Sequence, residues 1–206
     1  MKRSELFHPV VFDDPEWAEK YYNHNKKSIK MTGRRISGRL NKMGFRRGRV
    51  LDAGCGFGAV AIELAKAFPE AEIIGVDLSK PLLELGRNLV EKEGLSSYVT
   101  LREADVQDLS FMDDSFDLVV CTYMLHIVEK PLEMLEQIDR IAKPNACIFI
   151  TDLRRGSLAY FDKKLRTALS MRESRELIGQ SKLREGKMSR GLFWWDYVYS
   201  PTKTTK

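Results

Sequence analysis

The stretch 50-VLDAGCGFG-58 decides the fold of this 206-residue chain. An apolar run leads up to Asp52, three glycines alternate with other residues, and a helical spacing of apolar side chains begins at Ala61. A strand that enters a helix through a glycine-rich turn opens a βαβ unit, the repeating element of a parallel α/β sheet. Glycine suits this turn because a ligand can lie against the main chain where no Cβ intervenes.

The segments that follow repeat this alternation of strand and helix. Five apolar runs are predicted strands: residues 49–53, 72–77, 98–102, 116–121 and 146–151. Ser79 is a predicted N-cap for the helix after the second strand. A helix over 131–143 and a turn at Pro144-Asn145 precede the fifth strand. Beyond it, helices over 158–170 and 173–180 and an aromatic strand over 192–199 are predicted.

Composition excludes several classes of protein. The longest candidate for a membrane span, residues 116–128, is shorter than the ~20 residues a spanning helix needs, and no apolar segment follows the charged N-terminus. Neither membrane insertion nor export is expected. Three widely spaced cysteines match neither a disulfide framework nor a zinc site, which predicts reduced thiols in the cytoplasm and no metal. Lys and Arg clusters accompany the net charge of +5, and solvated faces are favoured over a nucleic-acid groove because no RNA-binding signature joins them.

The charge of Asp52 discriminates between ligands for the glycine turn. A dinucleotide site places a diphosphate here, which a fixed carboxylate would repel. A nucleoside that carries an ammonium and a sulfonium gains from the same carboxylate. Asp77 ends the next predicted strand 25 residues later, where an acid can accept hydrogen bonds from both ribose hydroxyls, and Leu78 can pack on the adenine. The pattern therefore predicts S-adenosylmethionine as the ligand.

From Arg49 to Asp152 the chain resembles the class I, Rossmann-like S-adenosylmethionine-dependent methyltransferases, whose first motif is an acid followed by GxGxG. It is most similar to the small-molecule, quinone-biosynthesis type. The resemblance implies an α/β, doubly wound sheet, mostly parallel with an antiparallel C-terminal strand, helices on both faces and an N-terminal helical cap. It divides the chain into a cap over 1–45 that belongs to the same domain, a methyltransferase domain over 46–200 and a disordered tail over 201–206.

The resemblance also implies where the cofactor binds. It places the methionine end on Asp52, the glycine turn and the end of the fourth strand, the ribose on Asp77, and the adenine beside Leu78 and the loop after the third strand. Cys55 in the turn is interpreted as a small filler, because no catalytic dyad accompanies it. The predicted cofactor-binding residues are Asp52, Gly54, Cys55, Gly56, Asp77, Leu78, Asp105, Val106 and Cys121.

Two features depart from the family pattern. A Pro-Gly-Gly turn usually precedes the fifth strand, whereas this chain has Pro144-Asn145-Ala146, and Asn tolerates the left-handed conformation that such a turn needs. The C-terminal region is short for two antiparallel strands. Residues 192–199 supply one of them, and residues 182–188 match the other poorly.

Several side chains keep two interpretations at this point. His126 is either a general base or a structural loop residue. Tyr21 and Tyr22 either close over the cofactor or anchor the first helix. The aromatic run 193–199 fits a strand in the core better than an acceptor pocket. No catalytic residue is assigned from the sequence.

The predicted function is in-line transfer of the methyl group of S-adenosylmethionine, with S-adenosylhomocysteine as product, to an unidentified small-molecule acceptor. A non-catalytic scaffold or regulatory protein that binds the same nucleoside is the main alternative. An RNA methyltransferase and an NAD-dependent oxidoreductase rank below it. The sequence predicts neither the methylated atom nor the oligomeric state.

Overall fold

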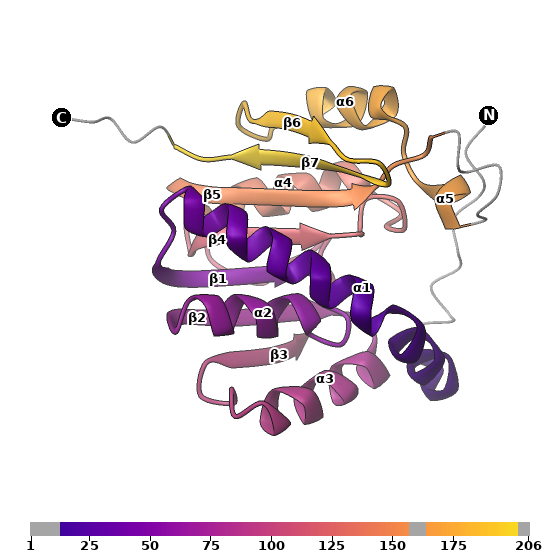
Figure 1. Ribbon diagram of the computed structural model, residues 1–206. Coiled ribbons are helices and arrows are strands. Elements are labelled where there is room, and N and C mark those ends of the chain that lie inside the picture. The colour runs from indigo at the N-terminus through magenta and orange to yellow at the C-terminus, as the bar shows by residue number, and fades with distance from the viewer. Residues whose placement is uncertain (1–12, 157–163, 202–206) are drawn as a thin grey trace.

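A single sheet organises the computed structural model, which describes residues 13–156 and 164–201. Within these ranges the sheet has seven strands in the order β3-β2-β1-β4-β5-β7-β6 (Figure 1). They are β1 Arg47–Ala53, β2 Glu70–Asp77, β3 Val99–Glu103, β4 Phe116–Thr122, β5 Ala142–Leu153, β6 Lys187–Arg190 and β7 Trp194–Tyr199. β1 to β5 pair in parallel, and β7 is antiparallel to both β5 and β6. The predicted fold class is confirmed.

Helices cover both faces of the sheet (Figure 1). The helices are α1 Pro15–Lys42, α2 Ala59–Ala67, α3 Lys80–Lys92, α4 Pro131–Ile141, α5 Lys164–Thr167 and α6 Met171–Gln180. Alternate strand residues point to opposite faces, so Val50 and Leu118 pack with α1, α2 and α3, whereas Leu51 and Val119 pack with α4. This alternation gives the sheet two apolar cores, as expected for parallel strands covered on both sides.

Local signals fix where the long helices begin. Asp14 caps α1 by accepting a hydrogen bond from the backbone N–H of Glu16 at 2.9 Å. Ser79 caps α3, as predicted, and its hydroxyl accepts from the N–H of Leu82 at 3.4 Å. Gly94 follows α3 with φ +69°, a conformation that favours glycine. Side-chain caps therefore define where α1 and α3 begin.

The predicted turn at Pro144-Asn145 is wrong, because both residues lie inside β5. The helix before it ends at Ile141, two residues earlier than expected. The register of β4 and β5 then shifts: Phe116 pairs with Ala142, and the next pair is Leu118 with Cys147. Three residues of β5 thus bulge out of the ladder. Proline has no N–H to donate, and it is tolerated in a bulge because the bulged residues make no ladder hydrogen bond.

The C-terminal part also differs from expectation. Of the predicted helix 158–170, residues 158–163 lie outside the described ranges, and α5 covers only four of the others. Leu169 bridges Arg154, and Ser170 begins α6 through a capping box with Glu173. The weak segment 182–188 ends in β6, so the described chain contains both antiparallel strands. Residues 1–12 of the predicted cap and 202–206 of the predicted tail lie outside the described residues.

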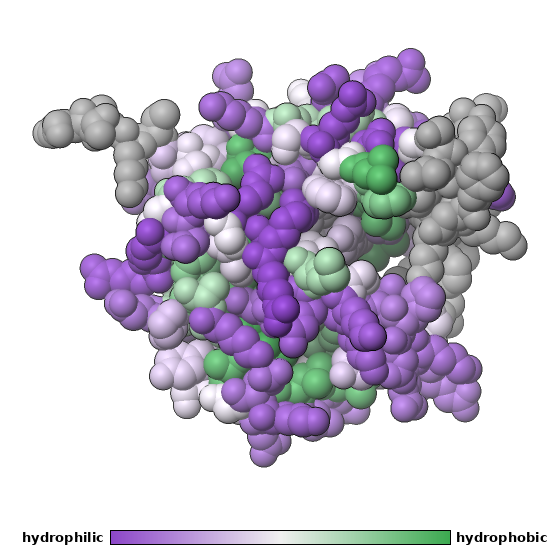
Figure 2. Space-filling view, in the orientation of Figure 1, coloured by the Kyte–Doolittle hydropathy of each residue, from purple (hydrophilic) through white to green (hydrophobic). Residues whose placement is uncertain are grey.

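Hydrophilic side chains dominate the surface over α1 in Figure 2. Several of them are paired. Arg34 contacts Glu63 of α2 at 2.9 Å, and Arg35 contacts Asp196 of β7 at 2.8 Å. The basic cluster at Arg34-Arg35 therefore joins elements of the fold. No helix in the described ranges combines the length and apolar character that crossing a bilayer requires.

Candidate functional site

A cavity of about 290 Å³ opens at the carboxyl ends of β1, β2 and β4. The strand order reverses here, because β1 continues to β2 on one side while β4 lies on the other. In an open α/β sheet such a switch point forms a crevice in which ligands bind. The cavity is lined by Tyr21, Ile29, Gly54, Cys55, Gly56, Phe57, Asp77, Leu78, Leu82, Ala104, Asp105, Val106, Gln107, Thr122, Tyr123, Met124, Ile127, Val128 and Glu129.

The structure brings seven of the nine predicted cofactor-binding residues to this cavity. They are Gly54, Cys55, Gly56, Asp77, Leu78, Asp105 and Val106. The other two, Asp52 and Cys121, are fully buried and do not belong to its lining. Asp52 Oδ2 accepts from the N–H of Ala61 in α2 at 3.1 Å, and Cys121 packs in the apolar core under α4. Both lie close to the cavity along the chain: Asp52 is two residues before Gly54, and Cys121 is directly before Thr122, and both of those residues line it.

The glycine turn needs its glycines for two reasons. Gly54 has φ +77°, and a Cβ added there would lie 2.2 Å from Sδ of Met124. Gly56 has φ +53°, and its N–H donates to Oδ2 of Asp77 at 2.7 Å. The first glycine makes room for the loop after β4, and the second joins the turn to the acid at the end of β2. The main chain therefore forms this wall of the cavity.

Burial raises the pKa of both strand-end acids. For Asp52, desolvation raises the pKa to about 7; the Ala61 N–H opposes this effect, and nearby Asp77 adds to it. Desolvation also raises the pKa of Asp77, against the N–H groups of Ser79 and Gly56. Oδ1 of Asp52 has no hydrogen-bond partner among the residues that the structure describes. These two carboxyl groups can therefore stabilise a cation that enters the site.

The cavity wall has acids but no bases. Asp77, Asp105 and Glu129 are on it, and none of the described lining residues is Lys, Arg or His. Such a wall attracts a positively charged ligand and offers no cation to a diphosphate. The site thus fits a ligand with a sulfonium and an ammonium, and it disfavours a dinucleotide.

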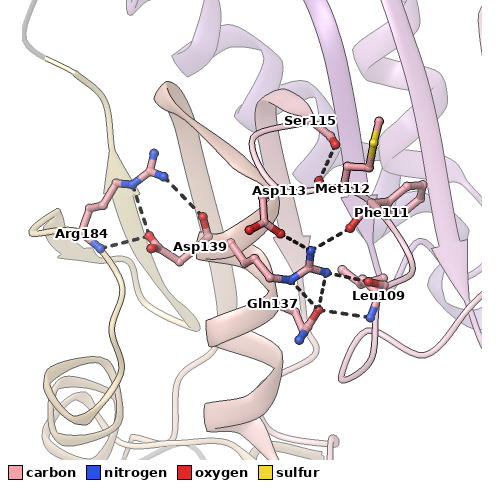
Figure 3. Close-up of polar contacts among 9 residues, drawn as sticks. Leu109, Phe111, Met112, Asp113, Ser115, Gln137, Asp139 and Arg184 are labelled. Carbon is pink, nitrogen blue, oxygen red and sulfur yellow. Dashed lines mark hydrogen bonds and ion pairs between the residues drawn. The ribbon is translucent and has the colours of Figure 1, made fainter.

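The loop after β3 is held by hydrogen bonds within the loop and by hydrogen bonds to α4 and the residue before it. Asp105 Oδ1 accepts from the N–H of Gln107 at 2.8 Å, and Gln107 Oε1 accepts from the N–H of Lys130 at 2.8 Å. Further along, Gln137 accepts from the N–H of Leu109 at 3.3 Å (Figure 3). Sequence reasoning missed Gln107, which links the loop after β3 to the start of α4.

Charged groups make further contacts near the C-terminal end of α4. Arg140 Nη2 donates to the carbonyl of Leu109 at 2.6 Å, and its Nη1 contacts Oδ1 of Asp113 at 2.7 Å. Asp139 pairs at 3.3 Å with Arg184, which lies between α6 and β6 (Figure 3). The Arg140 contacts therefore hold α4 against the loop that carries Asp105 into the cavity.

Helix α1 contributes an aromatic wall, and its two tyrosines differ. Tyr21 lines the cavity and stacks on Trp17 with ring centroids 5.0 Å apart. Burial, with a smaller effect of Asp77, raises the pKa of Tyr21 to about 12. Tyr22 is not on the wall and packs edge-on against Phe57 at 5.1 Å. Tyr21 thus faces the ligand space, and Tyr22 anchors the helix.

The loop after β4 supplies the residues that the sequence reasoning missed. Tyr123 has φ +61°, and its hydroxyl lies 2.7 Å from Oγ1 of Thr32 in α1. The lining residues here are Thr122 at the end of β4 and, in the loop, Tyr123, Met124, Ile127, Val128 and Glu129. Their position after a buried parallel strand was the available signal. His126 lies in the same loop, with Nδ1 2.5 Å from Oδ1 of Asp152, and is not itself on the wall.

The aromatic C-terminal strand belongs to the core, as predicted. Trp195 and Tyr197 are buried in the cluster between the sheet and α4. Phe193, just before β7, is exposed. The strand therefore does not provide the wall of the cavity described above.

Comparison with known proteins gives the same picture. Residues 50–145 match a family described as a methyltransferase domain. A malonyl-[acyl-carrier protein] O-methyltransferase of Legionella pneumophila is 33% identical over 149 residues, 72% of this chain and 50% of that protein. A demethylmenaquinone methyltransferase of Staphylococcus aureus is 34% identical over 124 residues, 59% of this chain and 50% of that protein. The chain spans about half the length of these curated relatives.

Solved structures share the whole fold at low sequence identity. A SAM-dependent methyltransferase from Aquifex aeolicus gives a TM-score of 0.74 at 20% identity and covers 90% of this chain and 97% of its own. The PH0226 protein from Pyrococcus horikoshii gives 0.66 at 18% identity, over 93% and 95% of the two chains. With its strand order, glycine turn and strand-end acids, the chain belongs to the class I, Rossmann-like S-adenosylmethionine-dependent methyltransferases.

Proposed function

We propose that this protein transfers a methyl group from S-adenosylmethionine to a small-molecule acceptor. One observation carries the proposal: among the described residues of its lining, the cavity combines a bare glycine turn with carboxyl groups and without a basic side chain. When bound, the cofactor supplies a methyl group on a sulfonium, which is already an activated leaving group. The protein then has to orient the acceptor and keep water out.

The residues of the wall suit the parts of this cofactor. We assign the methionine end to the Gly54–Gly56 turn, beside buried Asp52, whose ionised form a bound cation would favour. The ribose is assigned to Asp77, whose two oxygens each accept one backbone N–H and retain lone pairs for hydroxyl donors. The adenine is assigned to the space between Leu78 and the Asp105-Val106 pair.

A small acceptor is supported by the names of the two relatives, one acting on a malonyl group of a carrier protein and the other on demethylmenaquinone. An RNA acceptor has less support, because the basic pair Arg34-Arg35 is occupied by ion pairs with Glu63 and Asp196. A non-catalytic scaffold stays the alternative, and any methylated product would exclude it.

The remaining assignments concern organisation and compartment. We assign residues 1–45 to a cap on the same domain as residues 46–200, because Ile36 and Leu40 of α1 share an apolar core with the sheet. We assign the protein to the cytoplasm on its three cysteines, Cys55, Cys121 and Cys147, which are buried and free.

Calorimetry with S-adenosylhomocysteine tests the cofactor assignment. Binding is expected, together with a higher melting temperature, while NAD should change neither. Asp77→Ala should weaken binding at least about tenfold, because hydrogen bonds to a charged group contribute about 1.5–3 kcal/mol. Asp108→Ala, an exposed acid outside the cavity wall, is the matched control and should bind as the unchanged protein does. Binding of NAD, or unchanged affinity in Asp77→Ala, would contradict the assignment.

A further inference from the structure

Tyr123, on the cavity wall, has a backbone conformation that its residue type disfavours. It follows β4 directly and has φ +61°, in the left-handed region. For a residue with a Cβ this conformation costs about as much free energy as one hydrogen bond contributes. Such strain persists only where the surrounding contacts enforce it, and it is concentrated at ligand sites. The contacts that enforce it at Tyr123 therefore bear on the function of the cavity.

Hydrogen bonds at both ends of the residue hold Tyr123 in place. Its backbone N–H donates to the carbonyl of Thr151 in β5 at 2.8 Å. Its hydroxyl lies 2.7 Å from Oγ1 of Thr32, a buried residue of α1. The next residue, Met124, packs so closely on Gly54 that a Cβ added to that glycine would lie 2.2 Å from the sulfur. Tyr123 therefore joins α1 to a loop that is itself packed on the glycine turn.

Thr32 divides α1 into two parts with different surroundings. Before it, Ala18 and Tyr21 pack with Phe57 in a small apolar cluster beside the glycine turn. After it, Ile36 belongs to the larger apolar core that α1 shares with the sheet. In Figure 1 the N-terminal end of α1 lies on the side to which the arrows of β4 and β5 point, which is the side of the cavity. The Tyr123 hydroxyl thus contacts α1 at the junction between its core part and its cavity part.

The cavity part of α1 carries Tyr21, which lines the ligand space together with Tyr123. Burial, then Asp77 and then Tyr123, raise the pKa of Tyr21 to about 12. An electrostatic effect of Tyr123 on Tyr21 means that the two phenol groups lie near each other. One of them comes from α1 and the other from the loop after β4, so their spacing depends on the contact between these two elements. The bond between Tyr123 and Thr32 is such a contact.

Resting on the proposed function, we propose that Tyr123 is a positioning residue for S-adenosylmethionine: its hydrogen bond to Thr32 holds the cavity part of α1, and with it Tyr21, against the bound cofactor. The bond also offsets the strain at Tyr123, because the two free energies are similar in size. Without the hydroxyl, the loop and the cavity part of α1 separate more readily. Binding then has to restore their contact, so affinity for the cofactor falls.

Calorimetric titration with S-adenosylhomocysteine tests the hydroxyl. Tyr123→Phe and Thr32→Val each remove one partner and keep the shape of the side chain. Each should weaken binding by about two- to tenfold, the fold-change that corresponds to one hydrogen bond. The double variant should bind no more weakly than either single one, because the same bond is lost. Tyr98→Phe, an exposed tyrosine outside the cavity lining, is the matched control and should bind as the unchanged protein does. Unchanged affinity in either single variant, or losses that add, would overturn the proposal.

A second cycle separates positioning from direct contact with the ligand. Tyr21→Ala removes the ring that Tyr123 is proposed to hold against the cofactor. In this background Tyr123→Phe should lose most of its effect on the affinity for S-adenosylhomocysteine. A purely structural hydroxyl would change the melting temperature and leave the affinity unaltered in both backgrounds. A full loss of affinity in the Tyr21→Ala background would place the ligand on the Tyr123 hydroxyl itself and overturn the positioning role.

Hydrogen exchange of the empty protein tests the same bond without a ligand. Tyr123→Phe should speed the exchange of α1 amides before Thr32 and leave residues 36–42, next to the larger core, as they are. Equal exchange in the two proteins, or faster exchange along the whole helix, would overturn the proposal. If the unchanged protein does not bind S-adenosylhomocysteine, the proposed function fails. If it binds and Tyr123→Phe changes neither affinity nor exchange, only the role of Tyr123 fails.

Discussion

Two regions of one sheet bury their carboxyl groups in opposite ways. Asp196 in β7 contacts Arg35 at 2.8 Å and Arg39 at 2.6 Å, so its charge is met by two cations of α1. Asp52 and Asp77, at the ends of β1 and β2, appear in none of the ion pairs of the described chain and rely on backbone N–H groups. The first acid holds the fold together, and the second pair is left for a cationic ligand, which would favour the ionised form of both carboxyl groups.

The difference separates stability from binding within one sheet. A buried ion pair tolerates the loss of neither partner, because the remaining charge stays in a low-dielectric place. An unpaired buried acid lowers the stability of the empty protein, and binding of a cation restores that stability. Substitutions near Asp196 should therefore change the unfolding free energy, and substitutions near Asp52 and Asp77 should change ligand binding as well. Four substitutions test this difference, in order of decreasing effect.

Asp196→Asn should produce the largest loss of stability. It leaves Arg35 and Arg39 beside a neutral amide, and breaking such a pair costs about 3 kcal/mol or more of unfolding free energy. Urea denaturation would measure the loss, while affinity for S-adenosylhomocysteine in the folded protein should stay the same. A loss below about 1 kcal/mol would mean that the pair at β7 does not hold α1 to the sheet.

Gly54→Ala should follow, with a loss of about 2 kcal/mol. The residue has φ +77°, which costs about 1 kcal/mol for a non-glycine residue, and its new Cβ would overlap Sδ of Met124. Affinity for S-adenosylhomocysteine should fall as well, unlike in Asp196→Asn. Gly38→Ala in α1 is the control, since no atom lies within 4 Å of its added Cβ, and it should gain about 0.5–1 kcal/mol. Equal behaviour of the two alanine variants would contradict the prediction.

The acidity of Asp52 predicts a smaller effect, visible in the pH dependence. Its pKa rises from 3.8 to about 7 on folding, so the folded protein holds a proton that the unfolded chain has released. The stabilisation is complete below pH 3.8 and is lost as the pH rises through 7. Between pH 6 and 8 the empty protein should lose about 1 kcal/mol, since each pKa unit corresponds to about 1.4 kcal/mol. Thermal melts of Asp52→Asn should lack this slope, and a parallel slope in both proteins would exclude Asp52 as its source.

Arg47→Ala should have the smallest effect. Its ion pair with Glu70 at 3.8 Å joins two side chains that are 77% and 71% exposed, and such pairs contribute about 0–1 kcal/mol. The unfolding free energy should change by less than about 0.5 kcal/mol. A change as large as that of Asp196→Asn would remove the distinction between buried and exposed pairs on which the comparison depends.

The sequence predicted the fold best where a local pattern of residues is compatible with only one backbone structure. The glycine turn, the Ser79 cap and the alternating runs located the first four strands to within two residues, and seven of the nine residues predicted to bind the cofactor line one cavity. Pro144-Asn145 misled, because the same two residues suit a turn and a bulge. The cavity residues at 122–124 and 127–129 were not assigned from the sequence, since their place follows from which strands become neighbours.

The bulge in β5 has a practical consequence. Pro144 and Asn145 are exposed and lie near the N-terminal end of β5. The cavity and the His126–Asp152 pair lie at the opposite edge of the sheet, at the carboxyl ends of the parallel strands. Extra residues are already accommodated there without breaking the ladder that follows from Cys147. A fluorescent label on Asn145→Cys would therefore be positioned to follow tumbling or surface attachment of the protein without contact with the cavity.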